Sequence, residues 1–125
     1  FFVFDDKTIE AVEDVGYTAR QTIPAYLMVR DFFSWLNDEE ESMTIVEIGS
    51  RARSGNNSRG RISEHHHYTG TDLMAGENVD VIADAHALSE HIKHSSVDAV
   101  FGISVFEHLA MPWKVAIELN RILRV

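Results

Sequence analysis

Cysteine is absent from the sequence, and so is any long hydrophobic run. Without cysteine the chain cannot form disulfide bonds, use a thiol in catalysis or bind zinc and iron–sulfur clusters through thiolates. No apolar run approaches the roughly 20 residues that span a bilayer, and the apolar opening at residues 1–4 is too short and lacks the cationic flank of a signal peptide. We therefore expect a cytoplasmic protein.

Positive charge is also scarce, since 11 Lys and Arg face 20 Asp and Glu and give a formal net charge of −9. This balance repels phosphate backbones and anionic lipids, so nucleic acids and membrane surfaces are poor candidate partners. One local basic group stands out, consisting of Arg51, Arg53, Arg59 and Arg61. It is either an anion site for a phosphorylated or nucleotide-linked acceptor or a solvated loop, and we favour the loop.

The 125 residues, 45% of them hydrophobic, fit one ordinary domain. We divide them into an N-terminal helical segment, residues 1–43, and a core, residues 44–125. A weak helical pattern covers residues 6–15, and a helix is predicted from Pro24 to Asn37 because its apolar residues recur at three- and four-residue spacing. The acidic run at residues 38–41 indicates a solvated linker. The chain begins without Met and stops within a predicted helix, so we expect an excerpt of a longer polypeptide.

The core alternates predicted strands with predicted helices. Strands are expected at residues 43–49, 68–72, 79–83 and 97–103, where β-branched and apolar residues are concentrated. A short helix is expected at residues 85–93, and a second one from Pro112 to the end of the chain. This alternation predicts a parallel α/β sheet covered on both faces, with ligands bound at the carboxyl ends of the strands.

One connection is unusually short. Only residues 73–78 separate the second and third predicted strands, whereas a parallel crossover usually takes a dozen or more residues and includes a helix. Six extended residues reach about 20 Å, which covers the ~17 Å return along a five-residue strand. We predict that an extended strap replaces the helix and that Gly76 eases its turn, rather than that the two strands pair antiparallel.

The ends of the four predicted strands carry the chemistry. They read Val46–Ser50, Tyr68–Asp72, Ala83–His86 and Ile103–His108. Because these ends converge in a parallel sheet, they place several carboxylates and a glycine turn around one crevice. Taken with Arg121–Arg124 in the last predicted helix, the ordered set resembles the class I S-adenosylmethionine-dependent methyltransferases, in particular their type 11 group, over residues 44–125. The resemblance implies a Rossmann-like, mostly parallel sheet with flanking helices that stops after the fourth strand and its helix.

The resemblance also implies roles for individual residues. Glu47 and Gly49 would approach the methionine part of S-adenosylmethionine, Asp72 would accept both ribose hydroxyls, and Asp84 and Ala85 would reach the adenine. A carboxylate suits a diol because it accepts two hydrogen bonds at once, and Glu47 could instead hold its turn through backbone N–H groups. The full expected cofactor set is Glu47, Gly49, Ser50, Arg51, Asp72, Leu73, Asp84, Ala85, His86 and Ser104.

The chain departs from that family at its first turn. The second and third glycines of the usual pattern are replaced by Arg51 and Arg53, so the loop cannot keep its usual conformation wherever that requires positive φ. We expect Arg51 to face the crevice and Arg53 to be exposed. The first turn also lacks Gly-x-Gly-x-x-Gly, which disfavours a dinucleotide-binding domain.

The sequence leaves two functions open. The first is methyl transfer to a small-molecule or glycan-related acceptor, because residues 49–51 and 76–80 resemble methyltransferase domains linked to polysaccharide biosynthesis. The second is a non-catalytic module that kept the fold and lost the cofactor. No catalytic residue is predicted. His108 is either a general base or a cap of the last helix, and we favour the cap. We do not expect the consecutive His65, His66 and His67 to bind zinc, because neighbouring side chains point to different sides.

Overall fold

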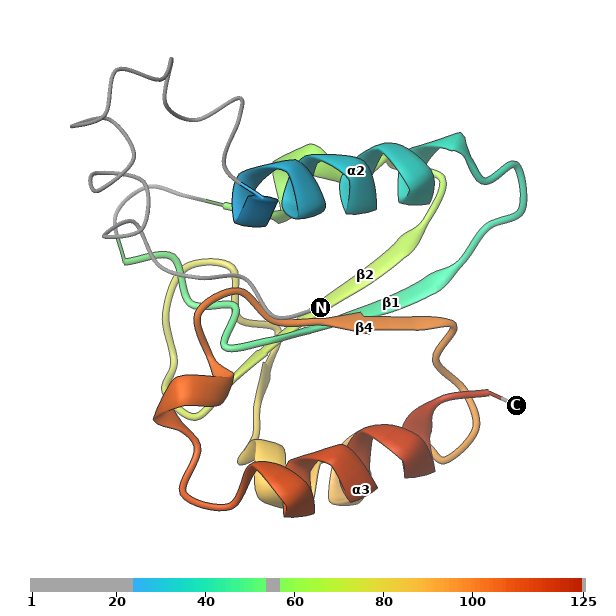
Figure 1. Ribbon diagram of the computed structural model, residues 1–125. Coiled ribbons are helices and arrows are strands. Elements are labelled where there is room, and N and C mark those ends of the chain that lie inside the picture. The colour runs from blue at the N-terminus through green and yellow to red at the C-terminus, as the bar shows by residue number, and fades with distance from the viewer. Residues whose placement is uncertain (1–23, 54–56, 125) are drawn as a thin grey trace, which may run out of the picture.

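The computed structural model describes residues 24–53 and 57–124, so the helix expected at residues 6–15 lies outside the described part (Figure 1). Its centre is a parallel sheet with the strand order β3-β2-β1-β4. The strands are β1 (Thr44–Ile48), β2 (His67–Asp72), β3 (Val81–Ile82) and β4 (Ala99–Phe101). The predicted parallel α/β sheet is therefore confirmed.

Helix α2 (Pro24–Asp38) covers one face of the sheet (Figure 1). It begins at the predicted proline, whose fixed φ suits the first helical turn. Its buried side chains, Phe33 and Leu36 among them, pack against Ile45 of β1 and Phe101 of β4. The rings of Phe33 and Phe101 meet edge to face with centroids 5.5 Å apart. Helix α2, the described helix of the segment that we separated from the core, thus shares the hydrophobic interior of the sheet.

The opposite face is covered by η3 (Ala85–Glu90), a short 3-10 helix, and by α3 (Pro112–Ile122) (Figure 1). Leu88 of η3 and Val115 of α3 are fully buried and pack against Val46 and Ile48 of β1. Strand β1 is consequently buried on both faces, as expected for the inner strand of a parallel sheet, and Glu47 is its one buried charged residue. The three layers give the Rossmann-like arrangement that the sequence predicted.

Several predicted boundaries were wrong. The helix expected at residues 85–93 ends at Glu90 and is interrupted at Ala87, whose φ of −140° is not helical. The last helix does not continue to the chain end, because Leu123 is extended and forms a parallel bridge with Val97. Backbone pairing across the sheet edge therefore overrides the helical pattern. Strands β3 and β4 are also shorter than predicted.

The connection between β2 and β3, residues 73–80, is the predicted strap, and it joins two parallel strands. It does not have to return along a whole strand, because β3 is short and pairs only with Thr71 and Asp72 at the end of β2. The strap lies directly on β2, where a Cβ at Gly70 would be 2.1 Å from the carbonyl oxygen of Asn78. Asn78 itself takes a left-handed conformation, with a φ of 68°.

In the described part of the chain, no helix is long and apolar enough to cross a membrane.

Candidate functional site

The turns that follow β1 and β4 touch each other at the carboxyl end of the sheet. Gly49, directly after β1, has a φ of +68°, and a Cβ there would lie 2.4 Å from Cγ2 of Val105. Both the backbone conformation and the space therefore require glycine. Ser104, directly before Val105, also has a positive φ of 52°. A non-glycine residue with a positive φ is strained. Such strained residues are concentrated at active sites and ligand-binding loops.

Asp72 ends β2 beside this turn. Its Oδ2 accepts a hydrogen bond from the backbone N–H of Arg51 at 3.2 Å, and its Oδ1 accepts one from the N–H of Met74 at 2.9 Å. The side chain is largely shielded, with 17% of its surface exposed. A carboxylate has about four lone-pair positions, so these two bonds leave Asp72 able to accept further hydrogen bonds from a ligand.

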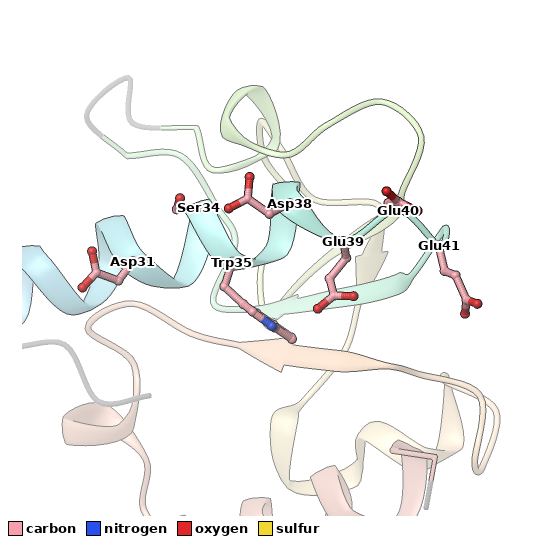
Figure 2. A pocket seen from close by; sticks show the side chains of 7 residues that line it. All are labelled: Asp31, Ser34, Trp35, Asp38, Glu39, Glu40 and Glu41. Atoms are coloured by element: carbon pink, nitrogen blue, oxygen red, sulfur yellow. The ribbon is translucent and has the colours of Figure 1, made fainter.

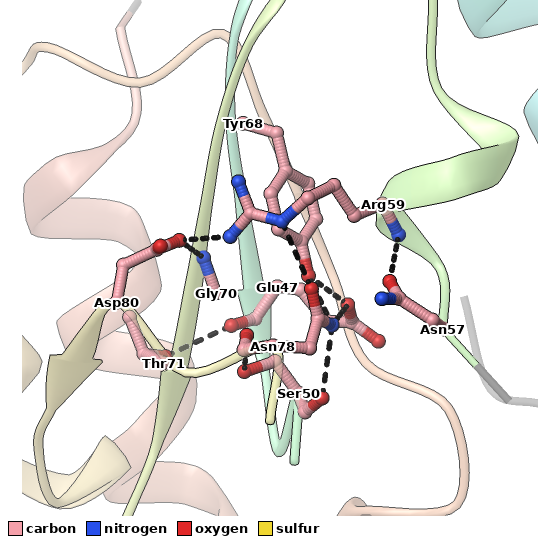
Figure 3. A network of polar contacts seen from close by, with 9 residues as sticks. All are labelled: Glu47, Ser50, Asn57, Arg59, Tyr68, Gly70, Thr71, Asn78 and Asp80. Atoms are coloured by element: carbon pink, nitrogen blue, oxygen red, sulfur yellow. Dashed lines mark hydrogen bonds and ion pairs between the residues drawn. The ribbon is translucent and has the colours of Figure 1, made fainter. Parts of the chain in front are cut away.

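Glu47 lies one strand away, and its carboxylate is already surrounded by donors (Figure 3). Its side chain is 5% exposed. Oε1 accepts from Oγ of Ser58 at 2.9 Å, while Oε2 accepts from the Tyr68 hydroxyl and from Nδ2 of Asn78 at 3.5 Å. Burial raises the pKa of Glu47 above its usual value, and the three hydrogen bonds oppose that rise. Of the two roles considered for Glu47, holding its turn through backbone N–H groups does not fit, because the hydrogen bonds to its carboxylate come from side chains.

The same contacts extend to the strap and to the loop before β2. Ser50 Oγ donates to the Asn78 carbonyl at 2.9 Å, and Asn78 Nδ2 donates to the Ser50 carbonyl at 3.0 Å. Arg59 donates to Oδ1 of Asn78 at 3.1 Å and to Oδ2 of Asp80, and its guanidinium lies 4.5 Å from the centre of the Tyr68 ring. These contacts fasten the strap over β1 and β2 (Figure 3).

Sequence reasoning did not identify Tyr68, Asn78 or Asp80 as parts of this site. Asp80 accepts hydrogen bonds from Arg59 and from the backbone N–H of Gly70, the latter at 2.7 Å. The sequence did contain one indication of their role. The strap that replaces the crossover helix is polar, and its polar groups need hydrogen-bond partners in the folded chain.

Asp84 and His86 follow β3 and have local structural partners. Asp84 Oδ1 accepts from the backbone N–H of His86 at 2.9 Å and from its Nδ1 at 2.7 Å, which caps η3. The backbone N–H of His86 is the main cause that lowers the pKa of Asp84. Nε2 of His86 accepts from the N–H of Met111 at 3.2 Å, which ties this turn to the start of α3. Ala85 packs against the core, whereas Leu73 is exposed.

The four arginines do not act as one group. The Arg51 side chain is 21% exposed and lies beside Asp72, whereas Arg53 is exposed, as predicted. Arg59 belongs to the contacts of the strap, and the Arg61 guanidinium lies 4.1 Å from the centre of the Phe33 ring. The structure thus places Arg51 beside Asp72, whereas Arg59 and Arg61 each lie over an aromatic ring of the fold.

The consecutive histidines hold the end of α2 to the start of β1. Buried His66 donates through Nε2 to the Leu36 carbonyl at 2.8 Å and accepts at Nδ1 from the N–H of Met43 at 3.1 Å. Nε2 of His65 donates to the carbonyl of Glu39 at 3.0 Å. Within residues 24–53 and 57–124, no three His, Asp or Glu side chains are grouped in a way that could hold a metal ion.

His108 ends η4 (Phe106–His108), whereas α3 begins at Pro112 with Met111 at its N-cap position. The expectation that His108 caps the last helix was therefore wrong. The N-cap position of α3 carries no side-chain cap.

A surface hollow lies at the other end of β1, beside the C-terminus of α2 (Figure 2). Apart from Ser34 and Trp35 its lining is acidic and includes the residues of the charged linker. Asp38, Glu40 and Glu41 are exposed there, in agreement with the predicted solvated linker. These residues lie on α2 and in the linker before β1, so the hollow is separate from the Gly49 turn that follows β1.

Comparison with known proteins relates the chain to one family. A family model for a methyltransferase domain, the type 11 group, matches residues 47–125. No curated protein and no solved structure matches the chain. The matched region begins in β1 and contains β2 to β4 with η3 and α3, which is the part that carries Gly49 and Asp72. On this match over more than half of its length, the chain belongs to the type 11 methyltransferase-domain family, within the class I S-adenosylmethionine-dependent methyltransferases.

Proposed function

We propose that the chain binds S-adenosylmethionine at the carboxyl ends of its strands and takes part in methyl transfer to a small-molecule or glycan-related acceptor. Membership of a methyltransferase-domain family supports methylation in general. The observation that carries the proposal is Asp72, a shielded carboxylate at the end of β2 that retains acceptor capacity beside the Gly49 turn. The proposed acceptor class rests on the resemblance of residues 49–51 and 76–80 to methyltransferase domains linked to polysaccharide biosynthesis.

The cofactor supplies an activated methyl group, which bonds to a lone pair of the acceptor while its bond to sulfur breaks and leaves the electron pair on sulfur. The chain's own task is mainly to bind and orient the two partners. In our proposal Asp72 accepts the ribose hydroxyls, and Gly49 lets the backbone approach the ligand. Leu73 and Ala85, with Asp84 and His86, form the adenine side, and the strained Ser104 shapes the loop opposite.

Glu47 and Ser50 take a supporting role in this proposal. The Glu47 oxygens already accept three hydrogen bonds, and Ser50 is buried and bonded to Asn78. Side chains of the fold thus use most of the acceptor capacity of Glu47, which is 5% exposed. We therefore assign both residues to fixing the strap beside the crevice, and we assign no residue as a catalytic base.

The test is titration of the chain with S-adenosylhomocysteine in a calorimeter. Asp72→Ala removes a charged acceptor, so we expect binding weaker by about 1.5–3 kcal/mol, or about 10- to 150-fold. Asp31→Ala, a change to an exposed carboxylate on α2, serves as the matched control and should bind like the wild type. Circular dichroism would establish that each variant is folded. No binding by the wild type, or equal binding by folded Asp72→Ala, would contradict the proposal.

A further inference from the structure

His66 connects the end of α2 to the start of β1 through both nitrogens of its ring. The side chain is buried, with 6% of its surface exposed. Nε2 lies 2.8 Å from the Leu36 carbonyl oxygen, and Nδ1 lies 3.1 Å from the backbone nitrogen of Met43. A carbonyl can only accept a hydrogen bond, and a backbone N–H can only donate one. The ring therefore has to carry its proton on Nε2 and leave Nδ1 unprotonated.

Protonation of His66 breaks this connection. The imidazolium form has a proton on both nitrogens, so Nδ1 becomes a donor that faces the N–H donor of Met43. The backbone N–H cannot become an acceptor, and the hydrogen bond between them is lost. The charge would also lie in a buried position, where an ion without a partner is costly. Only the neutral ring holds α2 and β1 together.

The neighbouring His65 can take up a proton without losing its contacts. Its Nε2 lies 3.0 Å from the Glu39 carbonyl oxygen, and its Nδ1 lies 2.7 Å from Oγ of Ser63. A hydroxyl can donate or accept, so Ser63 can turn its hydrogen away when Nδ1 of His65 is protonated. The centres of the two imidazole rings are 3.8 Å apart, so a charge on His65 adds to the cost of a charge on His66.

The charged groups near His66 do not pair with its ring. The segments that meet there carry carboxylates at residues 38–41 (Figure 2) and at Glu64, the cation Arg61, and the imidazoles of His65 and His67. In the part of the chain that the structure describes, no ion pair includes His66. Negative charge prevails among these groups and favours proton uptake as the pH falls, whereas burial and the Met43 N–H favour the neutral ring.

We propose that His66 is a pH-dependent switch that holds the C-terminal end of α2 to the sheet in its neutral form and releases it on protonation. Histidine in an unfolded chain titrates near pH 6.5, and a ring that must stay neutral makes the folded chain bind fewer protons than the unfolded one. Stability then rises with pH through this range. The connection is therefore present at neutral pH and is lost on acidification.

The switch lies at the opposite end of β1 from the Gly49 turn, and it does not rest on the proposed function. Its opening leaves the N–H of Met43 without an acceptor and frees the linker between α2 and β1, residues 39–43. Leu36, which is fully buried beside this linker, is the core residue whose contacts loosen first.

The experiment is a titration of the isotope-labelled wild-type chain by nuclear magnetic resonance between about pH 7.5 and about pH 5, the range in which histidine changes charge. Ring nitrogen shifts report which nitrogen of His66 carries the proton. Hydrogen exchange, expressed relative to an unstructured chain, reports the protection of each backbone amide. At the higher pH we expect the Nε2–H form.

Two amides show whether the release is local. As His66 takes up its second proton, the protection of the Met43 amide should fall about tenfold or more, as loss of one buried hydrogen bond predicts. The amide of Ser50, which donates to the Thr71 carbonyl at 3.0 Å on the other side of β1, should keep its protection.

Two variants separate the neighbouring histidines. His66→Gln offers an N–H group to the Leu36 carbonyl and cannot be protonated, so the protection of Met43 should no longer depend on pH. Its urea midpoint should lie below that of the wild type at the higher pH and approach it in acid. His65→Gln is the matched control, and the fall in Met43 protection should persist there.

Three results would overturn this inference. A proton on Nδ1 of His66 at the higher pH would show that the ring does not accept from Met43. Constant protection of the Met43 amide throughout the titration would show that no connection is lost. A pH dependence that disappears in His65→Gln but persists in His66→Gln would assign the switch to His65. The first two results come from the wild type and do not require that His66→Gln folds.

Discussion

Replacing Tyr68 by phenylalanine would test the contacts that fasten the strap. The Tyr68 hydroxyl donates to Oε2 of Glu47 and accepts from Nδ2 of Asn78 at 2.9 Å. Phenylalanine keeps the ring on which Arg59 lies and removes only the hydroxyl. Glu47, 5% exposed, would then keep Ser58 at 2.9 Å and Asn78 at 3.5 Å as its donors.

The expected loss of stability in Tyr68→Phe follows from the charge and burial of Glu47, which accepts the hydrogen bond. A hydrogen bond to a charged group contributes about 1.5–3 kcal/mol, and a buried group that loses a partner keeps its desolvation cost. We therefore expect Tyr68→Phe to lower the free energy of unfolding by about 2 kcal/mol near neutral pH. Tyr26→Phe on α2, at a tyrosine that is 36% exposed, is the control and should change it by less than about 0.5 kcal/mol.

The effect should also depend on pH. The Tyr68 hydrogen bond favours the ionised form of Glu47, so its loss raises the pKa of Glu47 beyond the rise that burial already causes. A buried carboxyl whose pKa is raised destabilises the fold when it is ionised, and this cost fades as the pH falls through the raised pKa. The difference between Tyr68→Phe and the wild type should therefore shrink on acidification.

Urea unfolding followed by tryptophan fluorescence, near neutral pH and at about pH 4, measures both quantities. The lower value lies below 4.5, the usual pKa of glutamate, so Glu47 is largely protonated in both folded proteins. A loss below about 0.5 kcal/mol near neutral pH would refute the view that the hydroxyl stabilises a buried charge. A loss of the same size at both pH values would show that the effect comes from packing alone.

Three further changes test other parts of the fold. Leu88→Ala should cost about 2–5 kcal/mol in urea unfolding because the side chain is fully buried, whereas Ile117→Ala at a half-exposed position of α3 should cost far less. Gly49→Ala should cost about 2–4 kcal/mol by the same assay, because alanine would adopt positive φ and collide with Val105. The backbone N–H of Thr44 in β1 is the main cause that lowers the pKa of Asp98. The ionised carboxylate therefore stabilises the fold at neutral pH, and this stabilisation is lost as the pH falls through the lowered pKa. Asp98→Asn should therefore be less stable than the wild type at neutral pH, with a difference that narrows in acid.

The strands and the start of α2 could be predicted from the sequence because their causes are local. The β-branched run before Gly49 favours a strand buried on both sides, and Pro24 marks the start of a helix whose apolar spacing is helical. Alternation of these elements implies a parallel sheet, and a parallel sheet brings its carboxyl ends together. The convergence of Gly49, Asp72 and the loop after β4 follows from that topology.

Tertiary structure decided what each polar group binds. Glu47 could be expected to need a partner because it lies in an apolar strand, but its donors come from Ser58, Tyr68 and Asn78, which only folding brings together. Likewise, Leu123 leaves the helix because Val97 offers it a backbone partner. A hydrogen bond between residues far apart in the chain depends on the register of strands and the path of loops, which sequence periodicity does not encode. The sequence thus determined the order of the strands and the turns that end them, and the packing of the strap determined that Arg51 lies beside Asp72 with no acceptor for its Nε–H group.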